Sequence, residues 1–554
     1  MLPNFWRRGG AALLAIAGMV LLPALPVHAQ SSSTPASTPA STPAASTTGS
    51  ARQLNAVVER PGLQMPQPEV PPVEGNAIVL SLDQAIEIAV QNNLDVVIER
   101  YNRSQSRLGI LDALGIYDLR AEAGLLYVDQ SQATTSQLQA SNFKQRQANF
   151  QLLQPLPNGG SIAVGVEAGR SETDVRFADP SSYSSGVTFS FSQPLLRGFG
   201  STNFENSLIL ARTDSAISLQ QFETQVTTTL QQVSEAYWDL VEAYEQLDVA
   251  QQSLNLAKDL HERNKIQVEV GTKPPLDLVQ SEAAIAEREE GIIRAQAAIG
   301  NSEDTLRRLL NFPDGQYWNL PIKTTTTPET NRLAINLDES IKTALERRPE
   351  LRLQNLNVER ARIQSAFLRN QAKPQLDLNI DYGLSGAGSS LSNTFDQITG
   401  IDFDGWTARL NFSYPLQNRS GRARTAIAEL VEESAQVSLD RAEAIIVTEV
   451  RQAARRVETA AKQIEAARAS RQFQEKNLDA ERKRYENGMS TSFQITQIQD
   501  DLTQAQSREV SAVIEYRRAL TEYYRATGRL LAEEDIELLD PAQPEKRFQF
   551  SLFR

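Results

Sequence analysis

The side chains that most often carry out enzyme chemistry are scarce in this sequence. Its 554 residues include 2 His and no Cys, which excludes disulfides, thiolate metal sites and thiol nucleophiles. His261 and Glu262 form half of a metalloprotease helix motif, but Lys265 stands where the second His is needed. We therefore predict that the protein is not an enzyme and that it has no catalytic residues, no metal site and no cofactor.

The overall charge narrows the choice of partners. The chain carries 55 Lys+Arg against 68 Asp+Glu, a net charge of -13 at pH 7. An acidic protein is poorly suited to bind a phosphate backbone. Basic clusters such as Arg482-Lys483-Arg484 are interpreted as solvated faces of a helix. We predict no nucleic-acid partner.

The N-terminal segment has the composition of an export signal. Residues 1–29 combine two arginines with an apolar run over 11–25 and end in Val27-His28-Ala29, which fits the pattern of a signal-peptide cleavage site. Residues 30–76 are rich in Ser, Thr, Pro and Ala, a composition typical of a disordered linker. We expect an exported protein with a linker ahead of its folded part.

The folded part of the chain is an internal duplication. Residues 80–86 match 335–341 at an offset of 255, and 189–195 match 410–416 at an offset of 221. The offset falls by 34 between these matches, so the first copy contains about 34 extra residues. The predicted domains are a first repeat, a second repeat and a C-terminal tail, at 77–330, 331–530 and 531–554.

Each repeat shows the same order of predicted elements. A helical segment and a region of short strands precede a very long helix, at 204–270 in the first copy and 421–487 in the second. A final helix follows a break at Gly271 or Gly488. Each long helix spans about 67 residues, or roughly 100 Å at 1.5 Å per residue. The first and last helices of a copy together match this length, which predicts a rod with one long helix beside two stacked ones.

Apolar residues recur every seven positions in the last helix of the first copy. They are Leu278, Ile285, Ile292, Ile299 and Leu306. A sustained seven-residue period indicates supercoiled packing against neighbouring helices. An ordinary two-stranded coiled coil fits the helices alone, but it does not explain the strand regions between them.

The strand regions alternate apolar and polar residues. The candidate strands lie at 125–129, 149–153, 162–168, 187–191, 376–382 and 408–414. An exported protein without apolar helices crosses lipid only as a closed barrel, because every backbone polar group must be paired. Four to six strands are too few to close a roomy barrel, so we expect several chains to share one.

Together these features resemble the TolC family of outer-membrane efflux proteins over about residues 77–530. The motifs that carry the resemblance are Leu82-Asp83-x-Ala85, Leu337-Asp338, Gln193-Pro194-Leu195, Ala236-Tyr237-Trp238-Asp239-Leu240, Val270-Gly271-Thr272 and Arg484-Tyr485-x-x-Gly488. The resemblance implies a mixed α/β membrane protein built from a tandem repeat. Its parts are expected to be a long periplasmic α-helical barrel and a trimeric transmembrane β-barrel, with about four strands from each protomer.

The same resemblance implies a function and partners. The protein is expected to be the outer-membrane exit duct of a tripartite efflux pump or a type I secretion system, extending into the periplasm. Its expected partners are two further copies in a homotrimer, a periplasmic adaptor (membrane fusion) protein, an inner-membrane transporter and outer-membrane lipid. Two alternatives are a freestanding porin-like channel and a structural periplasmic coiled-coil protein.

The resemblance assigns roles to the turns that follow the long helices. The turns around Gly271 and Gly488 are expected to form the periplasmic tip, because glycine permits a tight reversal of the chain. Adaptors dock at these turns in the family. The predicted docking residues are therefore Val270, Gly271, Thr272, Gly488 and Met489.

The resemblance also predicts a gate at this tip. Polar links between helices hold the tip closed in the family, and Asp277 and Tyr485 occupy matching positions here. Ser490 stands at a position that is often Arg in relatives, so one of these links is expected to be missing.

The constriction is expected to differ from that of relatives. They often carry a ring of acidic residues at the positions of Gln494 and Gln497. We hypothesise a ring of neutral amides, with Asp501, one helical turn further on, as a displaced acidic ring. The alternative is that the two Gln side chains only solvate a groove between helices.

The additional 34 residues of the first copy fall around positions 158–185. They predict either a longer external loop or an additional hairpin that folds over or enlarges the barrel. The segment 155–160, Pro-Leu-Pro-Asn-Gly-Gly, has the composition of a turn between strands, which gives this region some hairpin character.

Overall fold

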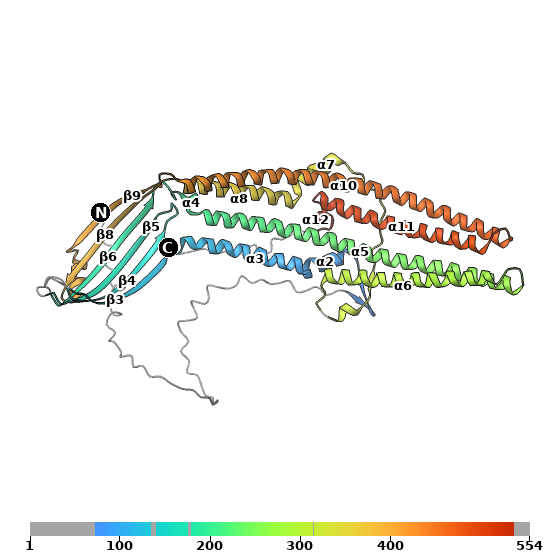
Figure 1. Cartoon of the computed structure of the whole chain (residues 1–554), viewed down its shortest axis with the longest axis horizontal. Helices are drawn as coiled ribbons and strands as arrows, with labels where there is room; N and C mark the ends of the chain where they lie inside the picture. Colours follow the sequence, from blue (N-terminus) through green and yellow to red (C-terminus); the bar gives the residue numbers. More distant parts are fainter. Residues whose placement is uncertain (1–71, 134–139, 176–178, 314, 537–554) are drawn as a thin grey trace, which may run out of the picture.

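The chain is elongated, with a β-sheet at one end and long helices running to the other (Figure 1). The computed structural model describes residues 72–133, 140–175, 179–313 and 315–536. The predicted signal peptide, most of the predicted linker and most of the C-terminal tail lie outside these residues. Within the described residues, no helix is both long and apolar enough to span a bilayer.

The helices occur in two sets that follow the order of the repeats. The first set is α2 (Leu82–Asn92), α3 (Leu94–Leu114), α4 (Ser201–Phe204), α5 (Asn206–Glu269) and α6 (Leu276–Leu310). The second set is α7 (Leu337–Arg347), α8 (Pro349–Gln371), α10 (Arg419–Glu486), α11 (Ser492–Ala526) and α12 (Leu530–Glu533). Equivalent caps begin the two sets, since the side chains of Ser81 and Asn336 accept hydrogen bonds from the backbone N–H groups of Gln84 and Glu339.

The long helices α5 and α10 organise the rod. They contain 64 and 68 residues, and each runs beside two shorter helices placed end to end (Figure 1). Helices α3 and α6 pack against α5, whereas α8 and α11 pack against α10. Helix α5 also contacts α8 and α11, which joins the two repeats. The predicted rod of one long helix beside two stacked helices is therefore present in both repeats.

A compact region at the middle of the rod anchors α5. A small sheet of β1 (Val73–Glu74), β2 (Ala77–Leu80) and β7 (Ile322–Thr324) lies there together with α2. Tyr237 and Trp238 of α5 are fully buried in this region, and the Tyr237 hydroxyl donates to the backbone oxygen of Leu80 at 3.1 Å. The Tyr237-Trp238 pair in the middle of a long helix is thus explained by packing.

The sheet at the other end contains more strands than the family pattern predicts. Its order is β3-β4-β5-β6-β8-β9, with every neighbouring pair antiparallel. The strands are β3 (Arg120–Ser131), β4 (Asn142–Pro155), β5 (Ser161–Thr173), β6 (Ser181–Pro194), β8 (Gln375–Gly388) and β9 (Asp404–Ser413). The first repeat supplies four of them, so the additional residues form a hairpin inside the sheet and not a longer external loop.

The added turn between β4 and β5 is built into the base of the sheet. The backbone oxygen of Asn158 accepts from the N–H of Gly200 at 3.1 Å, just ahead of α4. Gly159 has φ +88°, and a Cβ there would lie 2.5 Å from the backbone oxygen of Gly198. Glycine is therefore required by both conformation and space at this turn.

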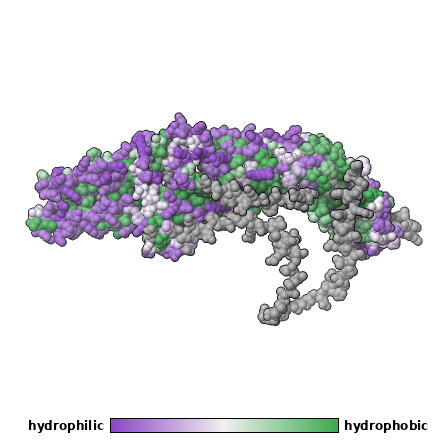
Figure 2. All heavy atoms as spheres, turned by 180° about the vertical axis from the view of Figure 1, so that it is seen from behind, coloured by the Kyte–Doolittle hydropathy of each residue, from purple (hydrophilic) through white to green (hydrophobic). Residues whose placement is uncertain are grey.

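The two faces of the sheet differ in polarity. One row of paired residues runs Leu152, Val164, Phe189, Tyr382 and Trp406 across five strands. Residues one position along each strand point to the opposite face, where hydroxyl, amide and carboxylate groups gather. Figure 2 shows hydrophobic residues gathered over the sheet end, while the helical part is mostly hydrophilic on that face. This division suits a wall between lipid and water.

Candidate functional site

The two helical hairpins end in equivalent turns at the tip farthest from the sheet (Figure 1). Gly271 and Gly488 have φ +75° and +73°. The N–H of Gly271 donates to Val268 O and that of Thr272 to Gln267 O, at 2.9 and 2.8 Å. The second repeat shows the same pair of bonds, from Gly488 and Met489. Both long helices thus end in a Schellman motif, which needs the left-handed conformation that glycine adopts freely.

The predicted gate residue Tyr485 lies at the centre of a buried polar cluster between the hairpins. Its hydroxyl donates to Oδ1 of Asn264 on α5. The Asn264 amide donates to the Ser492 hydroxyl at 2.8 Å and toward the backbone oxygen of Asp277 at 3.4 Å. Asn264 is 0% exposed and Tyr485 3% exposed. This cluster ties α10 and α11 to α5 and α6.

Lys273 contacts both Asp277 and Tyr485 and so links them. The Lys273 Nζ lies 3.6 Å from the Asp277 carboxylate and 3.4 Å from the centroid of the Tyr485 ring. An ammonium group over an aromatic ring is attracted to it, more strongly where water is excluded. The structure therefore brings both predicted gate residues together, with Lys273 and Asn264 as contacts that the sequence did not reveal.

Ser490 and Gln494 serve the start of α11. The Ser490 hydroxyl, which has one hydrogen to donate, lies 2.5 Å from Oε1 of Glu481 and 3.0 Å from Oε1 of Gln494. The Gln494 side chain also accepts from the Thr491 N–H at 3.2 Å, which completes a capping box. Glu481, which is buried, pairs with Arg484 at 3.0 Å. Gln494 is thus engaged in capping its own helix.

Further along α11, two neighbouring carboxylates have different surroundings. Asp501 accepts from the Gln497 amide at 3.4 Å. Asp500 pairs at 2.6 Å with Arg288 of α6, a buried guanidinium that also donates to Ser253 of α5 at 3.1 Å. Burial raises the pKa of Asp500 and Arg288 opposes this rise. Asp500 therefore links three helices, whereas Asp501 belongs to the surface of α11.

The predicted docking residues are exposed at the tip. Val270 is 70% exposed and Met489 63%. Leu276 and Phe493, which follow the two turns, are similarly exposed. Apolar side chains that belong to or follow the two turns are thus exposed at the end of the rod farthest from the sheet.

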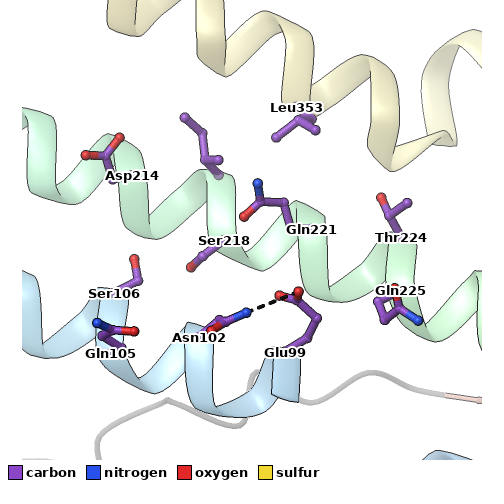
Figure 3. Close-up of a pocket in the computed structure, with 11 residues that line it drawn as sticks. Glu99, Asn102, Gln105, Ser106, Asp214, Ser218, Gln221, Thr224, Gln225 and Leu353 are labelled. Atoms are coloured by element: carbon purple, nitrogen blue, oxygen red, sulfur yellow. Dashed lines mark hydrogen bonds between the residues drawn. The ribbon is translucent and has the colours of Figure 1, made fainter. Parts of the chain in front are cut away.

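Mostly polar side chains line a groove among the helices (Figure 3). Its volume is about 640 Å³, and residues of α3, α5 and α8 line it. Asn102 donates to Glu99 at 3.2 Å on one side, and Gln221 and Gln225 of α5 lie on the other. The same part of α5 buries Phe222 on a different face. Neutral amides and hydroxyls dominate the lining, as expected of a surface in contact with water.

Across the residues that the structure describes, no three His, Asp or Glu side chains group closely enough to hold a metal ion. His261 instead contacts the hydroxyl of Ser281 at 2.9 Å, within the hairpin of α5 and α6.

Several solved outer-membrane channels have the same fold. The chain resembles the CmeC channel of Campylobacter jejuni at 15% identity and a TM-score of 0.60, covering 82% of this chain and 90% of that one. VceC of Vibrio cholerae gives 14% identity and a TM-score of 0.61, covering 81% and 96%. The open state of Neisseria gonorrhoeae MtrE gives 17% and 0.58, covering 84% and 98%.

Sequence comparison identifies the family. A search among curated proteins gives no match. The family model described as outer membrane efflux protein matches residues 161–311 and 340–529, one segment in each repeat and more than half of the chain together. The predicted TolC-like architecture is confirmed, and a porin or a purely structural coiled coil is not supported. The chain belongs to the outer membrane efflux protein family and is a channel of the outer membrane that extends into the periplasm.

Proposed function

We propose that three copies of the chain form one continuous duct, which receives its cargo from an inner-membrane transporter through a periplasmic adaptor. The duct serves an efflux pump or a type I secretion system, and the chain performs no catalysis of its own. The observation that carries this proposal is the incomplete sheet. In the described part of a single chain, the outer edges of β3 and β9 have no neighbouring strand, and unpaired backbone groups are not tolerated in lipid.

Pairing β3 of one copy with β9 of the next removes both edges. Six strands from each of three copies make a wall of 18 strands. Barrel diameter grows roughly in proportion to strand number, so this wall is about 1.5 times as wide as one built from four strands per chain. We therefore place the narrowest point of the duct at the helical tip and not in the membrane.

Exposed apolar side chains on the helices support the same assembly. They lie along α3 and along the first half of α10. On α3 they are Leu94, Ile98, Tyr101, Leu108 and Leu111. On α10 they are Ile427, Leu430, Val431, Val437 and Ile445. Such stripes are covered when α3 of one copy packs beside α10 of the next, which closes the helical barrel in register with the strands.

Because the sequence contains no cysteine, disulfide cross-linking can test the proposed pairing of β3 with β9 of the next copy. Ala123→Cys on β3 is combined in turn with Trp406→Cys, Ala408→Cys or Leu410→Cys, which lie on the apolar face of β9. We expect mild oxidation of outer membranes to yield covalent dimers and trimers for at least one pair. Ala123→Cys with Arg409→Cys, which points to the other face, is the matched control. Monomers from every pair would contradict the shared wall.

We further propose that the tip is a gate and a docking site. The cluster of Tyr485, Asn264, Lys273 and Asp277 holds the two hairpins of one protomer together. The adaptor docks on the exposed turns at Val270, Gly271, Thr272, Gly488 and Met489. The exposed positions of Val270 and Met489 support this docking role.

At the constriction we propose a ring formed by Gln497 and Asp501 from each copy. Gln494 contributes less, because its amide oxygen is engaged in capping α11. A trivalent cation such as hexaamminecobalt(III) is expected to block the duct through the Asp501 carboxylates, since charged rings concentrate counter-ions. The block should weaken in Asp501→Asn and persist in the control Asp304→Asn. Equally tight block of Asp501→Asn would remove Asp501 from the ring.

A further inference from the structure

Two tyrosines and two arginines form a row across the first four strands of the sheet. The register pairs Tyr127 with Arg146, Arg146 with Arg170, and Arg170 with Tyr183. Each lies an even number of residues from the apolar positions of its own strand, so all four occupy the apolar face. Basic side chains are otherwise unexpected on a surface that faces lipid.

The row lies at the outer border of the apolar band. The turn between β4 and β5 contacts the start of the helical part, so the other ends of these strands are external. Arg170 is eight residues from Ile162, the first apolar residue of β5. Eight residues span about 27 Å along a strand and roughly 20 Å of membrane depth at the usual tilt. The arginines are therefore at the level of the lipid headgroups of the outer leaflet.

The charges in this region do not cancel. Lys144 pairs with Asp129 at 3.3 Å, and Arg170 pairs with Glu172 at 3.0 Å. Within the described residues, no carboxylate pairs with Arg146, and the buried Nε of Arg170 has no hydrogen-bond partner. Like charges directly opposite each other on neighbouring strands destabilise a sheet. An anion between the two guanidinium groups would relieve this repulsion.

The tyrosines hold the arginines in place. The guanidinium carbon of Arg146 lies 5.8 Å from the centroid of the Tyr127 ring, and that of Arg170 lies 5.4 Å from the Tyr183 ring. These cation–π contacts restrain the long side chains and leave N–H donors available. A guanidinium fork matches the oxygens of a phosphate group in geometry and charge.

We propose that Arg146 and Arg170 bind a phosphate group of an outer-leaflet glycolipid such as lipid A. The inference rests on the proposed function, because it needs the sheet to stand as a wall in the outer membrane. The apolar side chains next to the row favour a lipid over free phosphate. Leu125, which is 90% exposed, and Ala148 and Ala168 lie two residues inward, where the acyl chains of a bound lipid would lie. The additional hairpin thus supplies a lipid site.

Native mass spectrometry of the purified oligomer tests this site. Bisphosphorylated lipid A is titrated against wild type and Arg146→Gln/Arg170→Gln. Losing two surface cations should weaken lipid A binding roughly 30-fold, while weak binding of zwitterionic phosphatidylcholine stays unchanged. Arg409→Gln is the matched control, because this arginine lies on the opposite face of the sheet near Asp381. It should bind lipid A like wild type.

A further variant and two further ligands distinguish lipid A binding from misfolding and from binding of free phosphate. Arg146→Lys/Arg170→Lys keeps the charges and should retain most of the binding, which guards against misfolding of the Gln variant. Undiminished binding by the Gln variant, or equal binding of dephosphorylated lipid A, would overturn the proposal. Displacement of lipid A by millimolar inorganic phosphate alone would assign the site to the free ion and also overturn it. Failure of the wild type to float with liposomes would instead contradict the membrane wall itself.

Discussion

At the scale of single residues, the tip depends on a polar cluster that long-range contacts create. The family resemblance pointed to Tyr485 and Asp277, because they match family positions at fixed distances from the glycines of the two turns. Asn264 was not, since it is one of many polar residues in a long helix and its partner Tyr485 lies 221 positions away. The same holds for Lys273, whose role depends on the ring it covers. Local spacing reveals turns, whereas contacts between hairpins require the packed structure.

Asn264→Ala should loosen the tip without unfolding the rod. The substitution leaves the buried hydroxyl of Tyr485 without its acceptor, and an unsatisfied buried group costs about 1–3 kcal/mol. We expect faster backbone hydrogen exchange over 260–275 and 485–495, with unchanged exchange around Trp238 in the middle of the rod. Asn301→Ala, at an exposed position of α6, is the matched control. Unchanged exchange at the tip would show that Asn264 does not help to hold the two hairpins together.

At the scale of elements, sequence patterns predicted the helices better than the role of the strands. The sequence placed α5 and α10 within a few residues of their observed ends, and the seven-residue period marked α6. Alternation also found strands in β4 and β5, but the family pattern of four strands left their place open. The observed register places β4 and β5 inside the sheet, because they pair along nearly their whole length with β3 and β6. Long-range pairing of this kind cannot be read from one strand alone.

The position of the additional hairpin can be tested by thiol labelling in outer membranes. Single cysteines are placed at Phe150 and Val164, on the apolar face, and at Gln151 and Glu167, on the polar face. We expect a water-soluble maleimide to label only the polar-face positions, because lipid covers the others. Ile380→Cys and Asp381→Cys on β8 are controls with the same expected contrast. Equal labelling at all four hairpin positions, with the β8 contrast intact, would place the hairpin outside the wall.

Two external loops are joined by one carboxylate. Asp174, after β5, accepts from the backbone N–H groups of Ser141 and Asn142 at 2.8 and 3.0 Å and also from the Ser141 hydroxyl. These bonds lower the pKa of Asp174 to about 2, with the Ser141 side chain the largest cause. A lowered folded-state pKa means that the link is fully formed above the ordinary Asp pKa of about 4 and weakens as the pH falls toward 2.

Hydrogen exchange at the amides of Ser141 and Asn142 measures this link. We expect their protection to hold from pH 7 to about 4 and to fall below that range. Asp174→Asn should lose part of this protection at neutral pH, because the amide offers one acceptor oxygen in place of two. Asp179→Asn, in the same loop region, should leave both amides unchanged. Equal protection in Asp174→Asn and wild type would mean that the loops are held together by other contacts.

At the scale of the whole molecule, the proposed duct combines a wide wall in the membrane with a tip that is closed at rest in the periplasm. The tandem repeat accounts for both parts, since each copy of the helix–strand–helix unit contributes strands at one end of the rod and a helical turn at the other. In the proposed assembly, the adaptor opens the duct and the transporter supplies the energy. We propose that the narrowest point, and hence the gate, lies at the turns after α5 and α10.

Single-channel conductance in a planar bilayer measures whether the tip closes the duct. The purified oligomer is compared with Asp277→Ala/Tyr485→Phe, which removes both predicted gate side chains, and with the control Asp304→Ala, which changes an exposed carboxylate away from the tip. We predict a small wild-type conductance that rises severalfold in the gate variant only. A large wild-type conductance that the gate substitutions leave unchanged would contradict it, because the duct would then already be open at the tip.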